Sequence, residues 1–428
     1  MRKMIVSPMA VVLFLLFTGC TRTTLLPDGE EISLSESKRD HRVELEFWHT
    51  YSDAETEVFE NKVIPLFESQ HPDIKIHAVR KDYTQQLKDD TFAAAIDNKS
   101  PDVMRMDIIW VPEFAKKGTL VNLLDMSGFE DIRKQFIGDL LTTNLYRGKY
   151  YGLPVNANTK VAIYNKKLLA RAGLDAPPAT FDELIQAVGR LREQDPELFG
   201  IGICCSSGWG TLPYFWTFGG KLTDPNYTRA SGYLDHPDSI AALEKIHRLY
   251  KERVISPSII GKEPGSWDGI LQGQLVMIEE AHWFYTVNAT GANKDLLQDV
   301  EIGVFPDDVN TGTSIIGGEN LVLFNGSEHK EQSWTFMQWM VTEEPQRIMA
   351  ETGLIPTIKN MRDTDHNEVY DTYLRQLGRA LPRPPVSTWT DIDNVYALMI
   401  EYILTEEKPL EDAVHDAVAE IDNLLSIQ

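Results

Sequence analysis

The residues of this sequence best suited to a functional site are aromatic and polar side chains that could bind a ligand. The apolar C–H face of a sugar ring stacks on an aromatic ring, and its rim hydroxyl groups need convergent donors and acceptors. Candidate stacking residues are Trp48, Trp110, Trp209, Tyr214, Trp216, Trp267, Trp283 and Trp389. Candidate polar partners are Asn156, Asn158, Asp107 and Glu319. One tryptophan alone is more often a packing residue, but the whole set favours a polar, ring-shaped ligand.

No catalytic signature accompanies these residues. The sequence lacks a Gly-rich phosphate loop with its lysine, a His-Glu-x-x-His pair, a Gly-x-Ser-x-Gly elbow and a Cys or His cluster at metal-ligand spacing. A glycosidase needs only two carboxylates about 5–10 Å apart, and Glu279-Glu280 are the most suggestive pair. Adjacent strand residues point to opposite faces, so we interpret these two as strand-end residues. We expect no catalytic residue, no metal and no cofactor.

Charge and cysteine content disfavour other classes of protein. The formal net charge is −23, with acidic residues spread along the chain, which disfavours binding to nucleic acid. The chain has three cysteines, of which Cys204 and Cys205 are adjacent. A vicinal disulfide would need a strained peptide, so buried free thiols in a strand are the favoured alternative. Neither arrangement predicts a redox enzyme.

The first residues have the pattern of a secretory signal peptide, over residues 1–19. Arg2 and Lys3 precede an apolar run from Met9 to Phe17, which is shorter than the roughly 20 residues that span a bilayer. Leu16 to Cys20 resembles the lipobox of bacterial lipoproteins, with Phe17 in place of the usual Leu; ordinary cleavage nearby is the alternative. A lipid on Cys20 would hold the protein at a membrane, facing the periplasm or the exterior. Residues 20–42 then form a lipidated cysteine and a polar tether.

From Val43 onward strands alternate with helices, the pattern of a parallel sheet with crossover helices. We expect strands at 43–49, 74–76 and 101–107, a capping box at Ser52 and Glu55 that starts a helix through Phe67, and a helix at 83–97. Further helices are expected at 165–172, 180–194, 240–250, 328–340 and 409–425. Ligands of open α/β sheets bind beyond the carboxyl ends of the strands. This rule places Trp48, His49, Tyr51 and Asp107 near a pocket.

Short motifs in a fixed order resemble those of a known family. The most specific run is Gly148 to Pro154, followed by Asn158-Thr159, Tyr164 to Lys166, Ala172 to Leu174, Pro177-Pro178 and Thr180 to Glu183. Supporting motifs are Phe47 to His49, Pro101 to Val103, Phe218 to Leu222, Gly273 to Met277, Gly317-Gly318, Thr352 to Pro356 and Pro384-Pro385. From Val43 onward the chain resembles the extracellular solute-binding proteins of the maltose-binding-protein class. It departs from their pattern at Phe181, where Trp is commoner, and at Glu279 to His282, where Gly-Pro often precedes the tryptophan.

The resemblance implies an α/β fold of the type II periplasmic-binding-protein kind, with two lobes, a hinge and a ligand cleft between the lobes. The implied N-terminal lobe is 43–157 plus 303–355, and the C-terminal lobe is 158–302 plus 356–428. Strands that cross between the lobes place the hinge at Asn156, Pro306 and Pro356.

Carried over by position, the resemblance also implies the ligand-binding residues. One wall of the cleft would hold Trp48, His49, Tyr51, Asp107, Trp110 and Asn158. The other would hold Tyr214, Trp283 and Trp389, with Gly318 and Glu319 contributed by the first lobe. Trp283 occupies the position where the family places a stacking aromatic residue.

The function implied is that of the substrate-binding lipoprotein of an ABC importer. It would capture a sugar or oligosaccharide by lobe closure and deliver it to membrane permease subunits, as a monomer and with ATP hydrolysis left to other subunits. A polyol or a glycerol phosphate ester is an alternative solute. A secreted carbohydrate-active enzyme, or a solute sensor or adhesion protein on the same fold, is the alternative function, because fold alone does not fix function.

Overall fold

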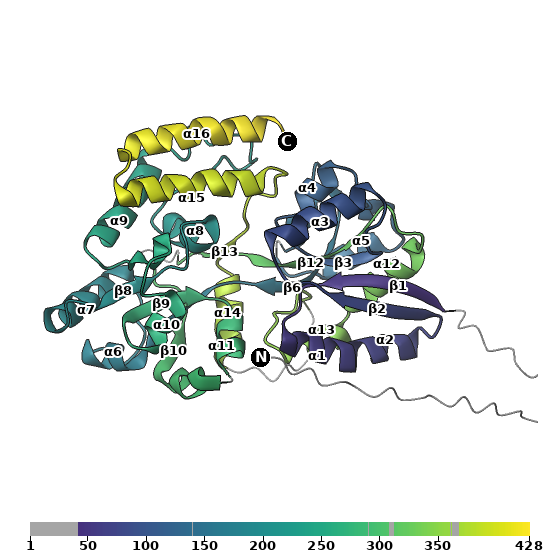
Figure 1. The fold of residues 1–428 in the computed structure, drawn as a ribbon, viewed down its shortest axis with the longest axis horizontal. Coiled ribbons are helices and arrows are strands. Elements are labelled where there is room, and N and C mark those ends of the chain that lie inside the picture. The colour runs from purple at the N-terminus through teal and green to yellow at the C-terminus, as the bar shows by residue number, and fades with distance from the viewer. Residues whose placement is uncertain (1–41, 139, 290, 308–311, 360, 362–367) are drawn as a thin grey trace, which may run out of the picture. The chain divides into compact units, whose positions relative to one another are not determined.

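The computed structural model describes residues 42–428 except 139, 290, 308–311, 360 and 362–367. The predicted signal peptide, Cys20 and the predicted tether as far as residue 41 therefore lie outside the described residues. The described strands form two main sheets (Figure 1).

The first sheet has the strand order β2-β1-β3-β12-β6 among the described residues. Its strands are β1 (Val43–His49), β2 (Ile74–Arg80), β3 (Val103–Asp107), β12 (Gly317–Leu323) and β6 (Leu153–Asn158). The first three run parallel, and β12 is antiparallel to both β3 and β6. Leu321 and Leu323 of β12 pack on one face of this sheet, whereas Val322 packs on the other. This alternation follows from the two-residue period of a strand and gives the sheet a core on each face.

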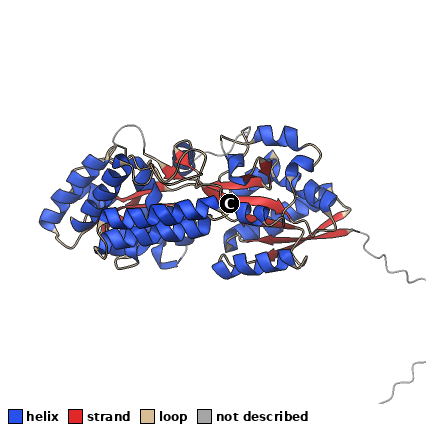
Figure 2. Ribbon diagram, turned by 90° about the horizontal axis from the view of Figure 1, so that it is seen from above, coloured by secondary structure: helices blue, strands red, loops and turns tan. Residues whose placement is uncertain are grey.

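Helices cover both faces of the first sheet (Figures 1 and 2). On one face lie α1 (Asp53–Val58), α2 (Ile64–Gln70), α12 (Lys330–Met340) and α13 (Glu343–Ala350). On the other lie α3 (Gln85–Ile96) and α4 (Val111–Lys116), and α5 (Phe129–Ile132) and the β4–β5 hairpin (Leu145–Tyr146, Lys149–Tyr150) complete this lobe. The predicted capping box is confirmed, because the Ser52 hydroxyl accepts from the Glu55 amide at 3.4 Å and the Glu55 carboxylate accepts from the Ser52 amide at 2.8 Å.

The second sheet has the order β10-β7-β9-β8 among the described residues. Its strands are β7 (Val161–Asn165), β8 (Phe199–Gly202), β9 (Leu275–Glu280) and β10 (Val300–Gly303). One face packs against α6 (Lys166–Arg171), α7 (Phe181–Gln194), α8 (Gly208–Thr217), α9 (Pro237–Lys251), α15 (Trp389–Thr405) and α16 (Leu410–Ser426). The other packs against α10 (Ser266–Leu271), α11 (Trp283–Asn288) and α14 (Glu368–Leu377). The predicted two-lobed α/β fold is confirmed.

The chain passes between the two sheets at three places in the described residues. Asn158 ends β6 and Val161 begins β7, so Thr159 and Lys160 join the first lobe to the second. The chain returns between β10 and β12, through the short β11 (Ser314–Ile315), which pairs with β13 (Ala380–Leu381). It crosses again after Ile355, whose carbonyl accepts from the Ala157 amide at 2.9 Å. Asn156, Pro306 and Pro356 lie in or beside these crossings, and their hinge role stays a prediction.

Several predicted elements differ in length, and the helices α8, α14 and α15 were not predicted. β2 continues to Arg80, four residues past the expected end, and the expected helix from Ser52 is divided by a π-helical turn at Phe59–Val63. Cys204 and Cys205 carry free thiols but follow the end of β8 at Gly202, so their expected place within a strand is wrong. No helix in the described part of the chain is long and apolar enough to cross a bilayer.

Candidate ligand-binding site

Arg105 joins the strand ends of the first lobe in one hydrogen-bonded network. Its guanidinium donates to Glu319 Oε2 at 2.7 Å, to Asn156 Oδ1 at 3.1 Å and to Thr50 Oγ1 at 2.9 Å. The Asn156 amide also donates to Glu319 Oε2, at 2.6 Å. Buried charges are stable only when they are paired and hydrogen-bonded. Arg105 is 3% exposed, and the network therefore fixes polar groups from β3, β6, β12 and the end of β1.

Burial sets the protonation of the groups around Arg105. Burial lowers the pKa of His49 to about 4, with the positive charges of Arg105 and Arg80 adding to the effect. Burial raises the pKa of Glu319, although the Arg105 guanidinium opposes this. Arg105 also lies 4.3 Å from the centroid of the Tyr51 ring, which is 1% exposed. His49 is therefore neutral at pH 7, and the Tyr51 ring packs against the Arg105 guanidinium.

Two half-buried tryptophans of the second lobe lie beside each other at the crossing. Trp209, in the first turn of α8, and Trp283, at the start of α11, have ring centroids 6.0 Å apart with planes tilted by 31°. A side-chain Cβ at Gly317 would meet a Trp209 ring carbon at 2.9 Å, so only glycine allows β12 to approach this ring. Gly317 lies two residues before Glu319, and the tryptophan pair therefore borders the polar network.

The buried Lys160 side chain is bonded to the backbone of Trp209. Its ammonium donates to the Trp209 carbonyl at 2.9 Å and to Glu279 Oε1 at 2.6 Å, and both charged side chains are 0% exposed. Burial raises the pKa of Glu279 to about 7, although the Lys160 ammonium opposes the shift. Glu280 instead accepts from Trp267 Nε1 at 2.8 Å. The two adjacent carboxylates have separate partners, as expected for neighbouring residues of a strand.

Two side-chain contacts join the first lobe to the second. His282 Nε2 lies 3.5 Å from Glu55 Oε1, joining the start of α11 to α1. Lys88 of α3 donates to Thr390 Oγ1 of α15 at 3.1 Å and pairs with Glu113 at 2.6 Å. Although burial opposes it, the hydrogen bond from His282 and the charge of Arg105 lower the pKa of Glu55 to about 2. The Glu55 carboxylate of the first lobe thereby pairs with the His282 side chain of the second lobe.

The structure brings together some of the predicted ligand-binding residues. Glu319 is a member of the Arg105 network, and Asn158 lies 3.5 Å from Asn156 within it. Tyr51 packs against the same guanidinium. Gly318 has a φ of +132° and would place a Cβ 2.4 Å from the Asn156 carbonyl, so its contribution is the backbone. Trp283 lies in the second lobe, in contact with Trp209 and His282.

Other predicted residues lie elsewhere. Tyr214 and Trp389 are 0% and 1% exposed in the core of the second lobe. Trp48 lies under Lys81, 4.1 Å from its ring centroid. Asp107, in contrast, lies beside the Arg105 network, because it pairs with Glu319 between β3 and β12. Its carboxylate accepts from the Tyr83 hydroxyl at 2.8 Å.

Trp110 and Tyr83 form a stacked aromatic pair in the first lobe. The Tyr83 ring stacks on Trp110 at 5.3 Å with an interplanar angle of 7°. Trp110 is 4% exposed, whereas Tyr83 is 55% exposed. The accessible ring in this group is therefore Tyr83, which the sequence did not single out.

Arg105 is the main residue that sequence reasoning missed, and Trp209 was a candidate stacking residue that was not assigned to the cleft. Arg105 interrupts the apolar strand Val103–Asp107, and a lone charge in a buried strand must have a partner. That signal predicts an acidic residue across the sheet, and Glu319 is that residue. Trp209 was counted among the aromatic residues, but only the packing of α8 distinguishes it from Tyr214. The described residues contain no group of three or more His, Cys, Asp or Glu side chains that could hold a metal ion.

The fold and this site together define a two-lobed solute-binding protein. Residues 52–347 match the family described as bacterial extracellular solute-binding protein, and the chain belongs to that family. A maltotriose-binding protein of Pyrococcus abyssi is 26% identical over 328 residues, which cover 73% of this chain and 66% of that protein. The diacetylchitobiose binding protein DasA of Streptomyces coelicolor is 22% identical over 70% of this chain and 71% of its own length.

Solved structures share the fold. The GacH receptor of Streptomyces glaucescens, solved unliganded and with acarbose, has a TM-score of 0.77 and 23% identity over 90% of this chain and 98% of its own. An ABC transporter solute-binding protein of Thermotoga lettingae, bound with α-D-tagatose, has a TM-score of 0.75 and 25% identity over 89% and 99%.

Proposed function

We propose that this chain captures a sugar or oligosaccharide and delivers it to the permease subunits of an ABC importer. The observation that carries the proposal is the Trp209–Trp283 pair next to the Arg105–Glu319–Asn156 network. The pair offers aromatic faces to the C–H surface of a sugar ring, and the network offers fixed amide and carboxylate groups to its hydroxyls. Two relatives support the same class of ligand, since one is named a maltotriose-binding protein and the other a diacetylchitobiose binding protein. The GacH receptor, which has a similar fold, was solved with acarbose.

Capture follows from contact with both lobes. A ligand that touches Trp283 in one lobe and Glu319 in the other stabilises only the arrangement in which those groups are close, and so selects it. The proposed lobes are 43–157 plus 303–355 and 158–302 plus 356–428, with Asn156, Pro306 and Pro356 at the crossings. The chain acts as a monomer in this proposal, and the importer's other subunits hydrolyse ATP.

A sugar screen by thermal shift tests the proposed function. A ligand present at about 100 times its dissociation constant stabilises the fold by about 2.7 kcal/mol, which raises the melting temperature. We expect at least one mono- or oligosaccharide to do so and to be recovered unchanged. Stabilisation only by polyols or glycerol phosphate esters would refute the sugar class, and a hydrolysed product would favour a carbohydrate-active enzyme.

Anchoring at Cys20 is a separate part of the proposal, supported by the sequence Leu16 to Cys20 and the polar residues after it. Two or more acyl chains, at roughly 0.8 kcal/mol per buried methylene, hold a protein at a membrane. Replacing Cys20 by alanine should move the exported protein from the membrane fraction to the soluble fraction. Retention of the variant in a detergent-sensitive membrane fraction would contradict the lipid anchor.

A further inference from the structure

The segment between β8 and α8 carries two adjacent cysteines. Cys204 Sγ and Cys205 Sγ lie 3.1 Å apart, both thiols are free, and both residues are partly exposed. The peptide bond between them is trans. Two sulfur atoms this close together and within reach of solvent can be joined by thiol–disulfide exchange.

The two thiols differ in acidity. The hydrogen bond from the Cys204 thiol lowers the pKa of Cys205 to about 6, although burial opposes the shift. The same bond and burial raise the pKa of Cys204. Ser207 Oγ, 3.2 Å from Cys205 Sγ, and the charge of Lys160 stabilise the Cys205 thiolate further. The thiolate is the nucleophilic form of cysteine, so Cys205 is the attacking sulfur and its neighbour the resolving one.

A disulfide between adjacent residues is strained and therefore easily reversed. Neighbouring Cα atoms are about 3.8 Å apart across a trans peptide, whereas Cα atoms bridged by a disulfide are usually about 4.4–6.8 Å apart. Strained disulfides are the labile ones, which are readily reduced again. The family of this chain is extracellular, and disulfide-forming oxidants act outside the cytosol. The cysteine pair therefore suits a reversible reaction better than a permanent cross-link.

Both cysteines are linked to the first turn of α8, which carries Trp209. The Lys160 ammonium lies 3.9 Å from Cys204 Sγ and donates to the Trp209 carbonyl at 2.9 Å. A Cβ at Gly210 would overlap the Cys205 carbonyl oxygen, so this turn has no free space towards the cysteines. Closing a disulfide brings the two sulfur atoms to about 2.05 Å and rotates the peptide between them. The first turn of α8 must then shift, and Trp209 shifts with it.

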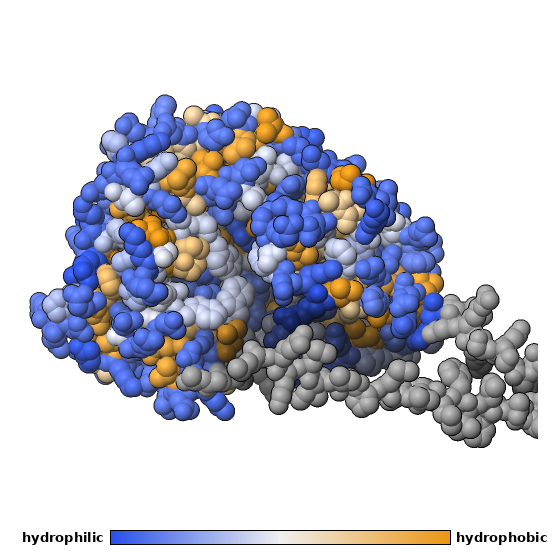
Figure 3. Space-filling view, in the orientation of Figure 1, coloured by the Kyte–Doolittle hydropathy of each residue, from blue (hydrophilic) through white to orange (hydrophobic). Residues whose placement is uncertain are grey.

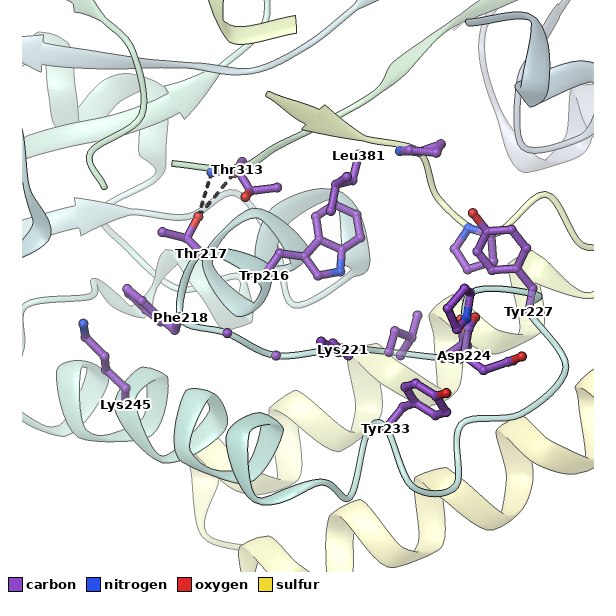
Figure 4. A pocket seen from close by; sticks show the side chains of 17 residues that line it. Trp216, Thr217, Phe218, Lys221, Asp224, Tyr227, Tyr233, Lys245, Thr313 and Leu381 are labelled. Atoms are coloured by element: carbon purple, nitrogen blue, oxygen red, sulfur yellow. Dashed lines mark hydrogen bonds between the residues drawn. The ribbon is translucent and has the colours of Figure 1, made fainter. Parts of the chain in front are cut away.

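The other end of α8 is held in place. Thr217 Oγ1 accepts from the Thr313 amide at 3.0 Å, beside a cavity of about 700 Å³ that Trp216 also lines (Figure 4). Because this end is fixed, a displacement at the first turn is not shared by the whole helix. Trp209 therefore moves relative to Trp283, which lies on α11, and the surface that the two rings share is disrupted.

We propose that Cys204 and Cys205 form a reversible oxidation site, at which a small-molecule disulfide converts the two thiols to a vicinal disulfide and weakens ligand binding at Trp209. The Cys205 thiolate attacks one sulfur atom of the oxidant and forms a mixed disulfide, releasing the first thiol. Cys204 then gives up its proton and attacks Cys205 Sγ, which releases the second thiol. In total the two cysteines lose two electrons and two protons, and the oxidant gains both. The effect on ligand binding rests on the proposed function, whereas the oxidation itself does not.

The oxidation is tested on the exported chain carrying Cys20→Ala, in which these two residues are the only cysteines. The surface seen in Figure 3 is mostly hydrophilic, and the formal net charge is −23. The disulfide of mercaptoethanol is a suitable oxidant, because it is water-soluble and uncharged and the acidic protein does not repel it. Increasing ratios of this disulfide to mercaptoethanol should remove both protein thiols together, with the loss of two hydrogen atoms by mass spectrometry, and dithiothreitol should restore them. Two free thiols at every ratio would overturn the proposal.

Single variants identify the attacking sulfur. Cys204→Ser leaves the attacking thiol without its resolving partner, so the mixed disulfide should accumulate at Cys205. Cys205→Ser should react more slowly, because burial raises the pKa of the thiol that remains. Equal rates for the two variants would contradict the assignment of Cys205 as the attacking sulfur.

The effect on ligand binding is measured by calorimetry with the best sugar from the thermal-shift screen. The oxidised protein should bind about tenfold more weakly than the reduced protein. The double variant Cys204→Ser with Cys205→Ser is the matched control, and the oxidant should leave its affinity unchanged. Equal affinities of the oxidised and reduced proteins would overturn the link to Trp209. If the reduced protein binds no sugar, the proposed function fails together with this link, and the thiol count alone decides the oxidation site.

Discussion

Replacing Trp283 by alanine distinguishes a ligand contact from a packing residue. The Trp283 ring is half-buried, 6.0 Å from the Trp209 ring and 5.3 Å from the His282 ring. Trp389 provides a matched control, since it is also a tryptophan at the start of a helix but is 1% exposed in the core. Truncation of both to alanine removes the same atoms from two different environments.

The expected magnitudes differ between the two variants. Loss of a buried tryptophan costs about 3–5 kcal/mol of folding free energy. At about 2–4 °C per kcal/mol, Trp389→Ala should lower the melting temperature by roughly 6–20 °C. A stacking residue in a binding site contributes about 2 kcal/mol to binding, which is a loss of roughly thirtyfold in affinity. Trp283→Ala should therefore weaken sugar binding at least about tenfold and change the ligand-free melting temperature by only a few degrees.

Differential scanning calorimetry without ligand and isothermal titration with the best sugar from the screen measure both quantities. Trp209→Ala should resemble Trp283→Ala, because the two rings form one surface. The reasoning is refuted if Trp283→Ala unfolds as early as Trp389→Ala while its folded fraction binds sugar normally. Trp283 would then be a core residue.

Two further predictions concern buried charges. Glu55, whose pKa in the folded protein is about 2 against 4.5 for the free group, contributes stability that is present above pH 4.5 and lost as the pH falls towards 2. Urea unfolding should show that the destabilisation caused by Glu55→Gln shrinks over this range, and a constant difference between pH 7 and pH 2.5 would contradict the pairing with His282. Lys160→Met should cost about 3–5 kcal/mol because it leaves Glu279 buried without its cation, whereas Lys160→Met with Glu279→Leu should recover most of that loss. An unchanged urea midpoint for the single variant would show that Glu279 is already neutral.

The fold was predicted well from the sequence because the local helix and strand patterns agree with the overall architecture. Alternating Leu45 and Phe47 and the capping box at Ser52 identify β1 and α1 without tertiary information. α8 and α15 were missed for opposite reasons. α8 contains a proline, Pro213, and two glycines, which weaken a helical pattern. α15 is apolar on most of its surface, so its period is poorly marked.

The site was harder to predict, because the residue types alone do not distinguish a pocket from a core. Trp209, Tyr214 and Trp389 all come from aromatic-rich stretches, and only the packing of α8 and α15 buries the last two. The Arg105 network depends on pairing between β3 and β12, which are far apart in the sequence. Non-local strand pairs of this kind leave no local pattern to read.

The position of β12 also determines when the protein can fold. β3 and β6 are separated in the first sheet by β12, and Glu319 pairs with Asp107 on one side and Asn156 on the other. The second lobe completes its core only with α15 and α16, the last helices of the chain. Such long-range pairing makes folding slow. A chain still being synthesised therefore cannot complete the first sheet before β12 has emerged, nor the core of the second lobe before α15 and α16 have emerged.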